Sequence, residues 1–237
     1  MADFLLTADP DNFVMTPGLL GPSDFLLALE GDDNVIGSDD NERINGNADD
    51  DNLIAGGGND RVYGGQGNDT LAGEAGIDFL SGDGGDDLLA GGLGADILLG
   101  GDGADIFVLQ VNPDDPAVGD VLVDYRPATQ GDRIELPDGL TEADLSPTPF
   151  AVPVDEALLA QLGALAQELD INLPPELQGI PLTPEIIRPA IQAFAGVDVD
   201  PDGDNIVTGT SVVVEATGEV LAFVANSTPA DLAGSFI

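Results

Sequence analysis

The stretch Gly64-Gly65-Gln66-Gly67-Asn68-Asp69-Thr70-Leu71-Ala72 is the clearest copy of a nine-residue unit that recurs through residues 28–108. Nine units follow one another without insertion or deletion, starting at Ala28, Gly37, Gly46, Ala55, Gly64, Gly73, Gly82, Gly91 and Gly100. The sixth place is acidic and the eighth place is a large apolar residue in every unit. A strict period of this kind predicts a stacked repeat architecture in which each unit contacts only its neighbours.

The chemistry of one unit predicts a tight turn followed by a short strand. Glycines at places one, two and four permit positive φ and a close approach between backbones. Places seven to nine put one apolar side chain between two outward ones, which is the alternation of a strand. Two units would close one coil, so we expect an all-β fold, a right-handed parallel β-roll (β-solenoid) about 20 Å long.

The place-eight side chains are expected to form a narrow core between the two sheets of the roll. One sheet would bury Val35, Leu53, Leu71, Leu89 and Phe107, and the other would bury Ile44, Val62, Leu80 and Leu98. Because the place-six carboxylates stack and repel one another, the fold needs cations between the turns. A hard divalent cation suits carboxylates and turn carbonyls, and calcium accepts irregular geometry more readily than magnesium.

The unit resembles the nonapeptide of the RTX (repeat-in-toxin, hemolysin-type) family of calcium-binding repeats. The resemblance implies several Ca²⁺ ions, each held between turns two units apart by place-six aspartates and by backbone carbonyls of the glycine-rich turns. Carried over to this chain, it pairs Asp51 with Asp69, Asp60 with Asp78, Asp69 with Asp87, Asp78 with Asp96, and Asp87 with Asp105. The turn glycines that it implies are Gly56, Gly58, Gly65, Gly67, Gly76, Gly85, Gly92, Gly94, Gly101 and Gly103. The alternative is a calcium-free β-solenoid with a solvated acidic face.

The first two units depart from this pattern. Ala28-Leu29-Glu30-Gly31 lacks the opening glycines. The unit that starts at Gly37 has no second glycine and carries Glu42 at its sixth place. We expect weak or missing calcium sites in both units.

The segments on both sides of the repeats are expected to cover the ends of the roll. Residues 1–27 place apolar residues among Pro and Gly turns, which predicts an N-terminal cap over otherwise unpaired backbone groups. Residues 109–149 alternate with period two between turn residues and resemble the segment that follows RTX repeats in secreted proteases. We expect them to form a strand-rich C-terminal cap that continues the sheet.

Residues 150–196 carry a helical pattern instead. Apolar residues recur at helical spacing over residues 155–169, and a second helix is predicted after Thr183 with Pro184 at its first position. Pro189 should kink or shorten that helix. The apolar faces of this predicted helical insertion either pack on the roll or its cap, or form a surface for a partner or for self-association.

An acidic loop follows the predicted insertion. Asp198, Asp200 and Asp202 stand at the first, third and fifth places, with glycine at the sixth, as in the first half of an EF-hand-type loop. Gly209 occupies the twelfth place, where such a loop needs a bidentate Glu. The loop either holds calcium with help from water or a remote carboxylate such as Glu215, or is a plain acidic turn.

Residues 197–237 also contain a predicted β-hairpin and a candidate export signal. Residues 210–214 and 219–224 are expected to pair around a short turn. The apolar end Phe236-Ile237 resembles the uncleaved C-terminal signals of type I secreted RTX proteins, although Ser235 stands where those signals have an acid. The alternative is an apolar C-terminus docked on the hairpin.

The composition excludes several classes of function. The chain of 237 residues has 45 acids and 5 bases, and its formal charge of −40 disfavours nucleic acids and anionic membrane surfaces as partners. No apolar run approaches the ~18 residues of a transmembrane helix. Because the chain has no Cys, His or Lys, it cannot carry a disulfide framework, a zinc-protease motif, a Ser–His–Asp triad or a Schiff-base lysine. Only carboxylate-pair chemistry of the glycosidase type remains, and we expect no enzyme.

Together these patterns predict a secreted calcium-binding β-roll that folds on binding several Ca²⁺ ions and has a structural or binding role at or outside the cell surface. The expected partners are calcium, the type I secretion machinery, and a cell-surface protein or polysaccharide. The start of the sequence, residues 1–6, lacks the basic region of a Sec signal, so export without N-terminal cleavage is expected. Two alternatives stay open: a calcium-responsive interaction module that uses residues 155–194, and a carbohydrate-active enzyme with a carboxylate pair.

Overall fold

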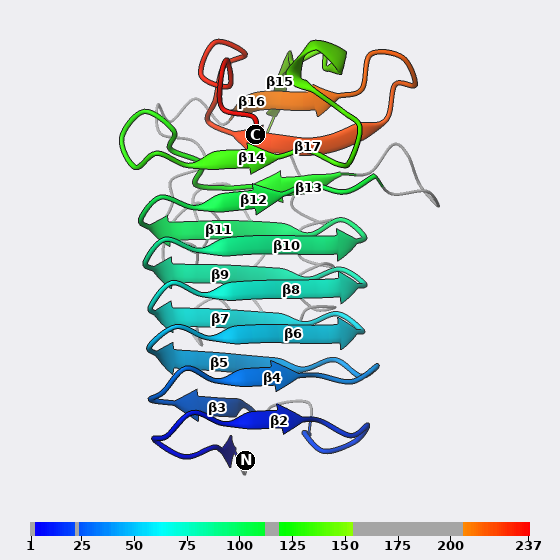
Figure 1. Cartoon of the computed structure of the whole chain (residues 1–237). Coiled ribbons are helices and arrows are strands. Elements are labelled where there is room, and N and C mark those ends of the chain that lie inside the picture. Colours follow the sequence, from blue (N-terminus) through cyan, green and yellow to red (C-terminus); the bar gives the residue numbers. More distant parts are fainter. Residues whose placement is uncertain (1–2, 22–23, 112–118, 154–205) are drawn as a thin grey trace.

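The chain forms a parallel β-solenoid in which two sheets face each other (Figure 1). The structure is a computed structural model and describes residues 3–21, 24–111, 119–153 and 206–237. In these ranges the regular structure is strand, apart from one 3-10 helix at Glu142–Asp144. The part of the chain that is described contains no helix long and apolar enough to cross a membrane.

The strands alternate between the two sheets along the repeats. The ten-stranded sheet has the order β1 (Phe4–Leu5), β3 (Leu26–Leu29), β5 (Arg43–Ala48), β7 (Arg61–Gln66), β9 (Phe79–Gly84), β11 (Ile97–Asp102), β13 (Asp120–Leu122), β17 (Val220–Ala225), β16 (Ile206–Val213) and β15 (Thr148–Pro153). The seven-stranded sheet has the order β14 (Arg133–Glu135), β12 (Ile106–Val108), β10 (Leu88–Leu93), β8 (Thr70–Ala75), β6 (Asn52–Gly57), β4 (Asn34–Ile36) and β2 (Asn12–Val14).

The register confirms the predicted coil of two units. Leu53 lies beside Leu71 and Leu71 beside Leu89 in the seven-stranded sheet, so each residue pairs with the residue one coil later. Val62 and Leu80 do the same in the ten-stranded sheet. All nine place-eight side chains have no exposed surface and belong to one core. This core is the stacked apolar column that the period of the sequence predicts.

The N-terminal residues continue the solenoid and pair with the strands at that end of the roll. Strand β1 pairs with β3, and β2 pairs with β4, both in parallel. The coil they form is longer, because Asp11 lies one coil before Asp33 at a separation of 22 residues. The predicted boundary at residue 27 falls inside strand β3. The apolar residues of this segment therefore belong to further strands, and the roll is longer than the nine units suggest.

The C-terminal residues also extend the ten-stranded sheet. Strands β13 and β17 continue the parallel stack on β11, and β16 and β15 then add to β17 in antiparallel order at that end of the sheet. Strand β15 includes residues 150–153, so the predicted helical insertion cannot begin at residue 150. The helices predicted over residues 155–169 and 183–194 lie outside the described residues.

Candidate metal centre

One oxygen of each place-six aspartate links two neighbouring coils. Along one edge of the roll, the backbone N–H of Asp51 donates to Asp69 Oδ1 at 2.8 Å. The N–H of Asp69 donates to Asp87 Oδ1 at 2.8 Å, and that of Asp87 to Asp105 Oδ1 at 3.0 Å. These bonds form a ladder in which each aspartate side chain reaches back to the coil before it.

The other edge of the roll carries a second ladder of the same design. The N–H of Asp60 donates to Asp78 Oδ1 and the N–H of Asp78 to Asp96 Oδ1, each at 2.8 Å. The structure therefore brings together all five aspartate pairs that the resemblance implies. It does so through a backbone hydrogen bond that the sequence pattern did not reveal.

The second oxygen of each ladder carboxylate is buried and accepts no hydrogen bond. This holds for the Oδ2 atoms of Asp33, Asp51, Asp60, Asp69, Asp78, Asp87, Asp96 and Asp105. The side chains themselves are at most 3% exposed. Burying a carboxylate oxygen without a hydrogen-bond donor destabilises the fold, unless a cation lies beside the oxygen.

A backbone carbonyl from the next coil shares the space in front of this oxygen. A Cβ placed on Gly64 would overlap Asp69 Oδ2 and would lie 2.9 Å from the carbonyl oxygen of Gly82. The same arrangement surrounds Gly46, Gly73 and Gly82. Two oxygens that face one small space repel each other. A cation between the coils would attract both oxygens and offset this repulsion. A side chain at place one would enter this space, so glycine leaves the most room for both oxygens.

The donor set suits calcium. Calcium takes six to eight oxygens, including carboxylates and backbone carbonyls, at about 2.3–2.6 Å. Within the described residues, no three Asp, Glu, His or Cys side chains gather in one cluster. Backbone carbonyls must therefore supply much of the coordination. When bound, the ion supplies the positive charge that the stacked carboxylates lack.

The turn glycines at places two and four stand where carbonyl oxygens approach the backbone of the next coil. A Cβ on Gly65 would overlap the carbonyl oxygen of Asn47, and a Cβ on Gly67 that of Asp49. Both glycines also have positive φ, 113° and 139°. The other predicted place-two and place-four glycines stack in the same way on the coil before them: Gly56, Gly58, Gly76, Gly85, Gly92, Gly94, Gly101 and Gly103. The place-one carbonyl of the next coil also faces the carboxylate, and the sequence pattern did not single it out.

Four overlapping copies of a family model described as the RTX calcium-binding nonapeptide repeat match residues 23–53, 36–71, 45–80 and 72–107. Residues 23–107 are RTX repeats. No curated protein and no solved structure matches the chain. The stacked strands, the aspartate ladders and the family match together identify a calcium-binding RTX β-roll.

The first two RTX units differ from each other at place six. The Asp33 carboxylate joins the ladder, because its Oδ1 accepts the N–H of Asp11 at 2.7 Å and its Oδ2 has no partner. Glu42 instead bends back to its own unit and accepts the hydroxyl of Ser38 at 2.5 Å. The weak or missing calcium sites expected in both units stay a prediction.

Two aspartates that the sequence analysis missed extend the ladders beyond the RTX repeats. Asp120 Oδ1 accepts the N–H of Asp96 at 3.2 Å, and Asp132 Oδ1 accepts that of Asp105 at 3.2 Å. The sequence did contain a signal. In both Asp120-Val121-Leu122 and Asp132-Arg133-Ile134 an acid stands two places before a buried apolar residue, as in places six to eight. The coil separations of 24 and 27 residues hide this pattern from a search at a fixed period.

At Asp132, where one ladder ends, a hydrogen-bond donor of the protein reaches the second carboxylate oxygen. The N–H of Arg126 donates to Asp132 Oδ2 at 2.5 Å, so this oxygen has a partner, unlike those in the RTX units. Asp124 accepts the N–H groups of Gly100 and Gly101, both at 2.9 Å, and lies 3.5 Å from the Arg126 guanidinium. An arginine and backbone amides thus meet the carboxylates at this end of the roll.

Burial raises the pKa of the ladder carboxylates in the calcium-free roll. The pKa of Asp60 rises to about 8 and that of Asp78 to about 7, because each carboxylate loses water. Backbone hydrogen bonds lower these values in part, while neighbouring aspartates raise them further. Burial likewise raises the pKa values of Asp51 and Asp87 to about 7, and those of Asp69 and Asp105 to about 6.

Acid should therefore stabilise the calcium-free roll. Because these carboxylates bind protons more tightly in the folded chain than in the unfolded chain, the free energy of unfolding falls as pH rises from about 4 to about 8. We expect circular dichroism of the metal-free chain to show more β-structure at the acid end of this range than at the alkaline end. We also expect the calcium concentration at the folding midpoint to drop as pH rises, since calcium displaces protons. More β-structure at the alkaline end without calcium would contradict the burial of these groups.

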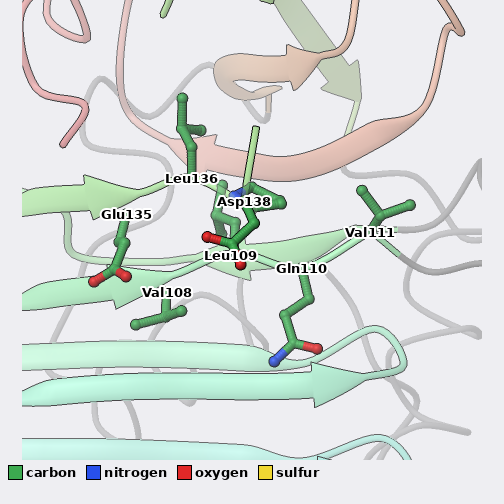
Figure 2. Close-up of a pocket in the computed structure, with 8 residues that line it drawn as sticks. Val108, Leu109, Gln110, Val111, Glu135, Leu136 and Asp138 are labelled. Atoms are coloured by element: carbon green, nitrogen blue, oxygen red, sulfur yellow. The ribbon is translucent and has the colours of Figure 1, made fainter. Parts of the chain in front are cut away.

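Two other candidate sites are the predicted acidic loop and a hollow beside strands β12 and β14. Asp198, Asp200 and Asp202 lie outside the described residues. A shallow hollow of about 350 Å³ opens where strands β12 and β14 end, and Val108, Leu109, Glu135, Leu136 and Asp138 contribute to its lining (Figure 2). Its acidic lining residues are Glu135 and Asp138, and with 45 acids in the chain such proximity indicates no chemistry.

Proposed function

We propose that this protein is an extracellular calcium-dependent β-roll that folds around several Ca²⁺ ions and serves a structural or binding role at or outside the cell surface. One observation carries the proposal: the eight buried Oδ2 atoms without donors stand in two columns along the RTX repeats. Each column is a row of buried oxygens that a cation between the coils would contact. Folding without cations would leave those oxygens buried and unpaired.

Calcium would act in this fold as a structural counter-charge. Each ion would lie between consecutive coils, near the Oδ2 of one aspartate and the place-one carbonyl of the next coil. The place-six Oδ1 atoms would keep the coils in register through their backbone hydrogen bonds. Since calcium ligands come together only when the coils stack, binding energy becomes folding energy.

The extracellular setting follows from the calcium requirement and the charge of the chain. Extracellular modules bind calcium with Kd values of about 10⁻⁴–10⁻³ M, and a chain of charge −40 stays extended and soluble without it. We propose that the type I machinery exports the unfolded chain, which then folds outside. The segment that the exporter reads would be residues 210–237, which include strand β17.

Export can be tested in a host that carries a type I exporter. Deletion of residues 210–237 should hold the protein inside the cell, whereas deletion of residues 1–27 should leave it in the medium. A calcium-loaded cytosolic pool as the sole detectable form would reject export and favour an intracellular calcium buffer.

The middle RTX units should contribute most to calcium affinity. Asp69 and Asp78 each lie between two ladder neighbours, while Glu42 is turned away from its ladder. We expect Asp69→Ala and Asp78→Ala to lower the number of bound ions or raise the calcium midpoint, and Glu42→Ala to do so much less. Isothermal titration calorimetry measures both quantities. The reverse order would show that the proposed calcium register is wrong.

A further inference from the structure

Two turns of the roll satisfy their own carboxylate with a hydroxyl group. Thr7 stands four residues before Asp11, and Ser38 stands four residues before Glu42. The backbone N–H and the hydroxyl of Thr7 both donate to Asp11 Oδ2 at 2.8 Å. The Ser38 hydroxyl donates to Glu42 Oε1 at 2.5 Å, and the Ser38 N–H lies 3.4 Å from Glu42 Oε2. We call these two turns the hydroxyl turns.

The two hydroxyl residues occupy the same place in the coil. Ser38 stands at place two of its RTX unit. The parallel pairing of β1 with β3 puts Thr7 level with Leu29, which is also at place two. Each hydroxyl oxygen also accepts the backbone N–H two residues later, from Asp9 at 3.4 Å and from Asp40 at 3.2 Å. Local bonds of this kind let Ser and Thr fix a turn by themselves.

Eight other turns form a second class, which we call the open turns. They end at the eight aspartates whose Oδ2 atoms are buried without a donor. None of them has Ser or Thr at place two, and every place-two residue has positive φ. These residues are Leu29, Asn47, Gly56, Gly65, Glu74, Asp83, Gly92 and Gly101. Thr7 and Ser38 do not have positive φ.

The hydroxyl, and not the lack of glycine, separates the two classes. Leu29 and Glu74 adopt φ of 85° and 77° in open turns although neither is glycine. The left-handed region is disfavoured for a β-branched residue such as Thr, and a Ser or Thr hydroxyl offers the turn a bond of its own instead. The residue at place two therefore sets both the backbone of the turn and the partner of the carboxylate.

We infer that the residue at place two decides whether a turn takes calcium, and that Thr7 and Ser38 close their turns to the ion. The inference rests on the proposed function, in which the open turns hold calcium through Oδ2. At Asp11 this oxygen already has two donors, which a cation would have to displace.

The turn that ends at Glu42 differs from an open turn beside place one as well. At Gly64, the atom nearest to an added Cβ would be the carboxylate oxygen of the same unit, Asp69 Oδ2. At Gly37, the nearest atom would instead be the carbonyl oxygen of Ala55. The Glu42 carboxylate therefore lies further from this space than the aspartate of an open turn does.

A double variant should open the turn that ends at Glu42. Ser38→Gly removes the hydroxyl and permits positive φ at place two, and Glu42→Asp restores the acid of an open turn. At saturating calcium, Ser38→Gly/Glu42→Asp should bind one more ion per chain than the unaltered protein, as counted by equilibrium dialysis. Glu42→Asp alone is the matched control and should gain none, because Ser38 can hold an aspartate as Thr7 holds Asp11.

The reverse change should close an open turn. Asn47 stands at place two of the turn that ends at Asp51, whose Oδ2 has no donor. Asn47→Ser puts a hydroxyl four residues before Asp51 and should lose one bound ion. Asn47→Ala loses the same bond from Asn47 Nδ2 to the Asn45 carbonyl, 3.2 Å, but adds no hydroxyl, so it should keep the ion. Anomalous diffraction from calcium locates the site that appears or disappears.

The outcomes separate this inference from the proposed function. An extra ion in Glu42→Asp alone would show that the length of the acid, and not the hydroxyl, closes the turn. Equal ion counts in Asn47→Ser and Asn47→Ala, or no gain in the double variant, would overturn the inference while calcium binding by the unaltered chain still supports the proposed function. An unaltered chain that binds no calcium would overturn the proposed function and the inference with it.

Discussion

Removal of calcium is expected to unfold this chain almost completely. The folded roll buries eight carboxylate oxygens that have no donors, and the core adds only one large apolar side chain per unit. Without a cation, the stacked carboxylates must take up protons or separate. At neutral pH, circular dichroism should show a largely unfolded chain in chelator and a β-rich chain after addition of about 1 mM calcium.

Magnesium and salt are the controls for this result. Magnesium demands near-octahedral geometry and gives up water reluctantly, so the same concentration should restore little β-structure. Sodium chloride at matched ionic strength screens repulsion but cannot fill the contacts between coils. Equal β-content in excess chelator and in calcium at neutral pH would show that the roll folds without the ion.

Substitution of a place-one glycine is expected to damage one calcium site strongly. In Gly82→Ala the new Cβ would overlap Asp87 Oδ2 and stand 2.6 Å from the carbonyl oxygen of Gly100. Two repeats already have alanine at place one, Ala28 and Ala55, and both side chains are fully buried. We therefore expect Gly82→Ala to fold at saturating calcium, with a higher calcium midpoint and a stability loss of about 1–3 kcal/mol from overpacking.

Two matched variants separate the calcium effect from general strain. Gly84→Ala alters the same repeat, but its Cβ would meet nothing closer than the carbonyl oxygen of Gly65 at 3.8 Å, so it should leave the calcium midpoint unchanged. Ala55→Gly should lower the midpoint, because it opens the space in front of Asp60. Calcium titrations followed by circular dichroism compare all three with the unaltered chain. A larger midpoint shift in Gly84→Ala than in Gly82→Ala would reject the place-one geometry.

The period of the sequence was enough to predict the fold and its core. Because acid and apolar residues recur every nine places, a coil of two units pairs Leu53 with Leu71, and the structure has this register. The five aspartate pairs came from the resemblance to RTX repeats, which places each ion between turns two units apart. Strong local repetition leaves few alternative registers, which is why a single sequence suffices here.

The ends of the roll could not be predicted in this way. The coils that contain Asp11, Asp120 and Asp132 have longer loops, so their ladder positions do not fall on the nine-residue period. Such loops add residues at little cost in stability while the strands keep their register.

The backbone geometry of the site was also hidden from the sequence. Glycine at a given place permits a close approach, but it does not show which carbonyl faces the carboxylate. Glu74 and Asp83 adopt positive φ, 77° and 70°, at place two, where four other units have glycine. The stacked coils therefore impose the turn conformation on residues that rarely adopt it alone.

The most direct test of calcium between the coils is a crystal structure of the calcium-loaded protein with anomalous diffraction from the ion. The account predicts anomalous peaks in two columns, one along Asp51, Asp69 and Asp87 and the other along Asp60, Asp78 and Asp96. Each peak should lie about 2.3–2.6 Å from an Oδ2 atom of its column. A well-ordered roll with no peaks beside these oxygens, or with calcium bound only elsewhere, would contradict the account.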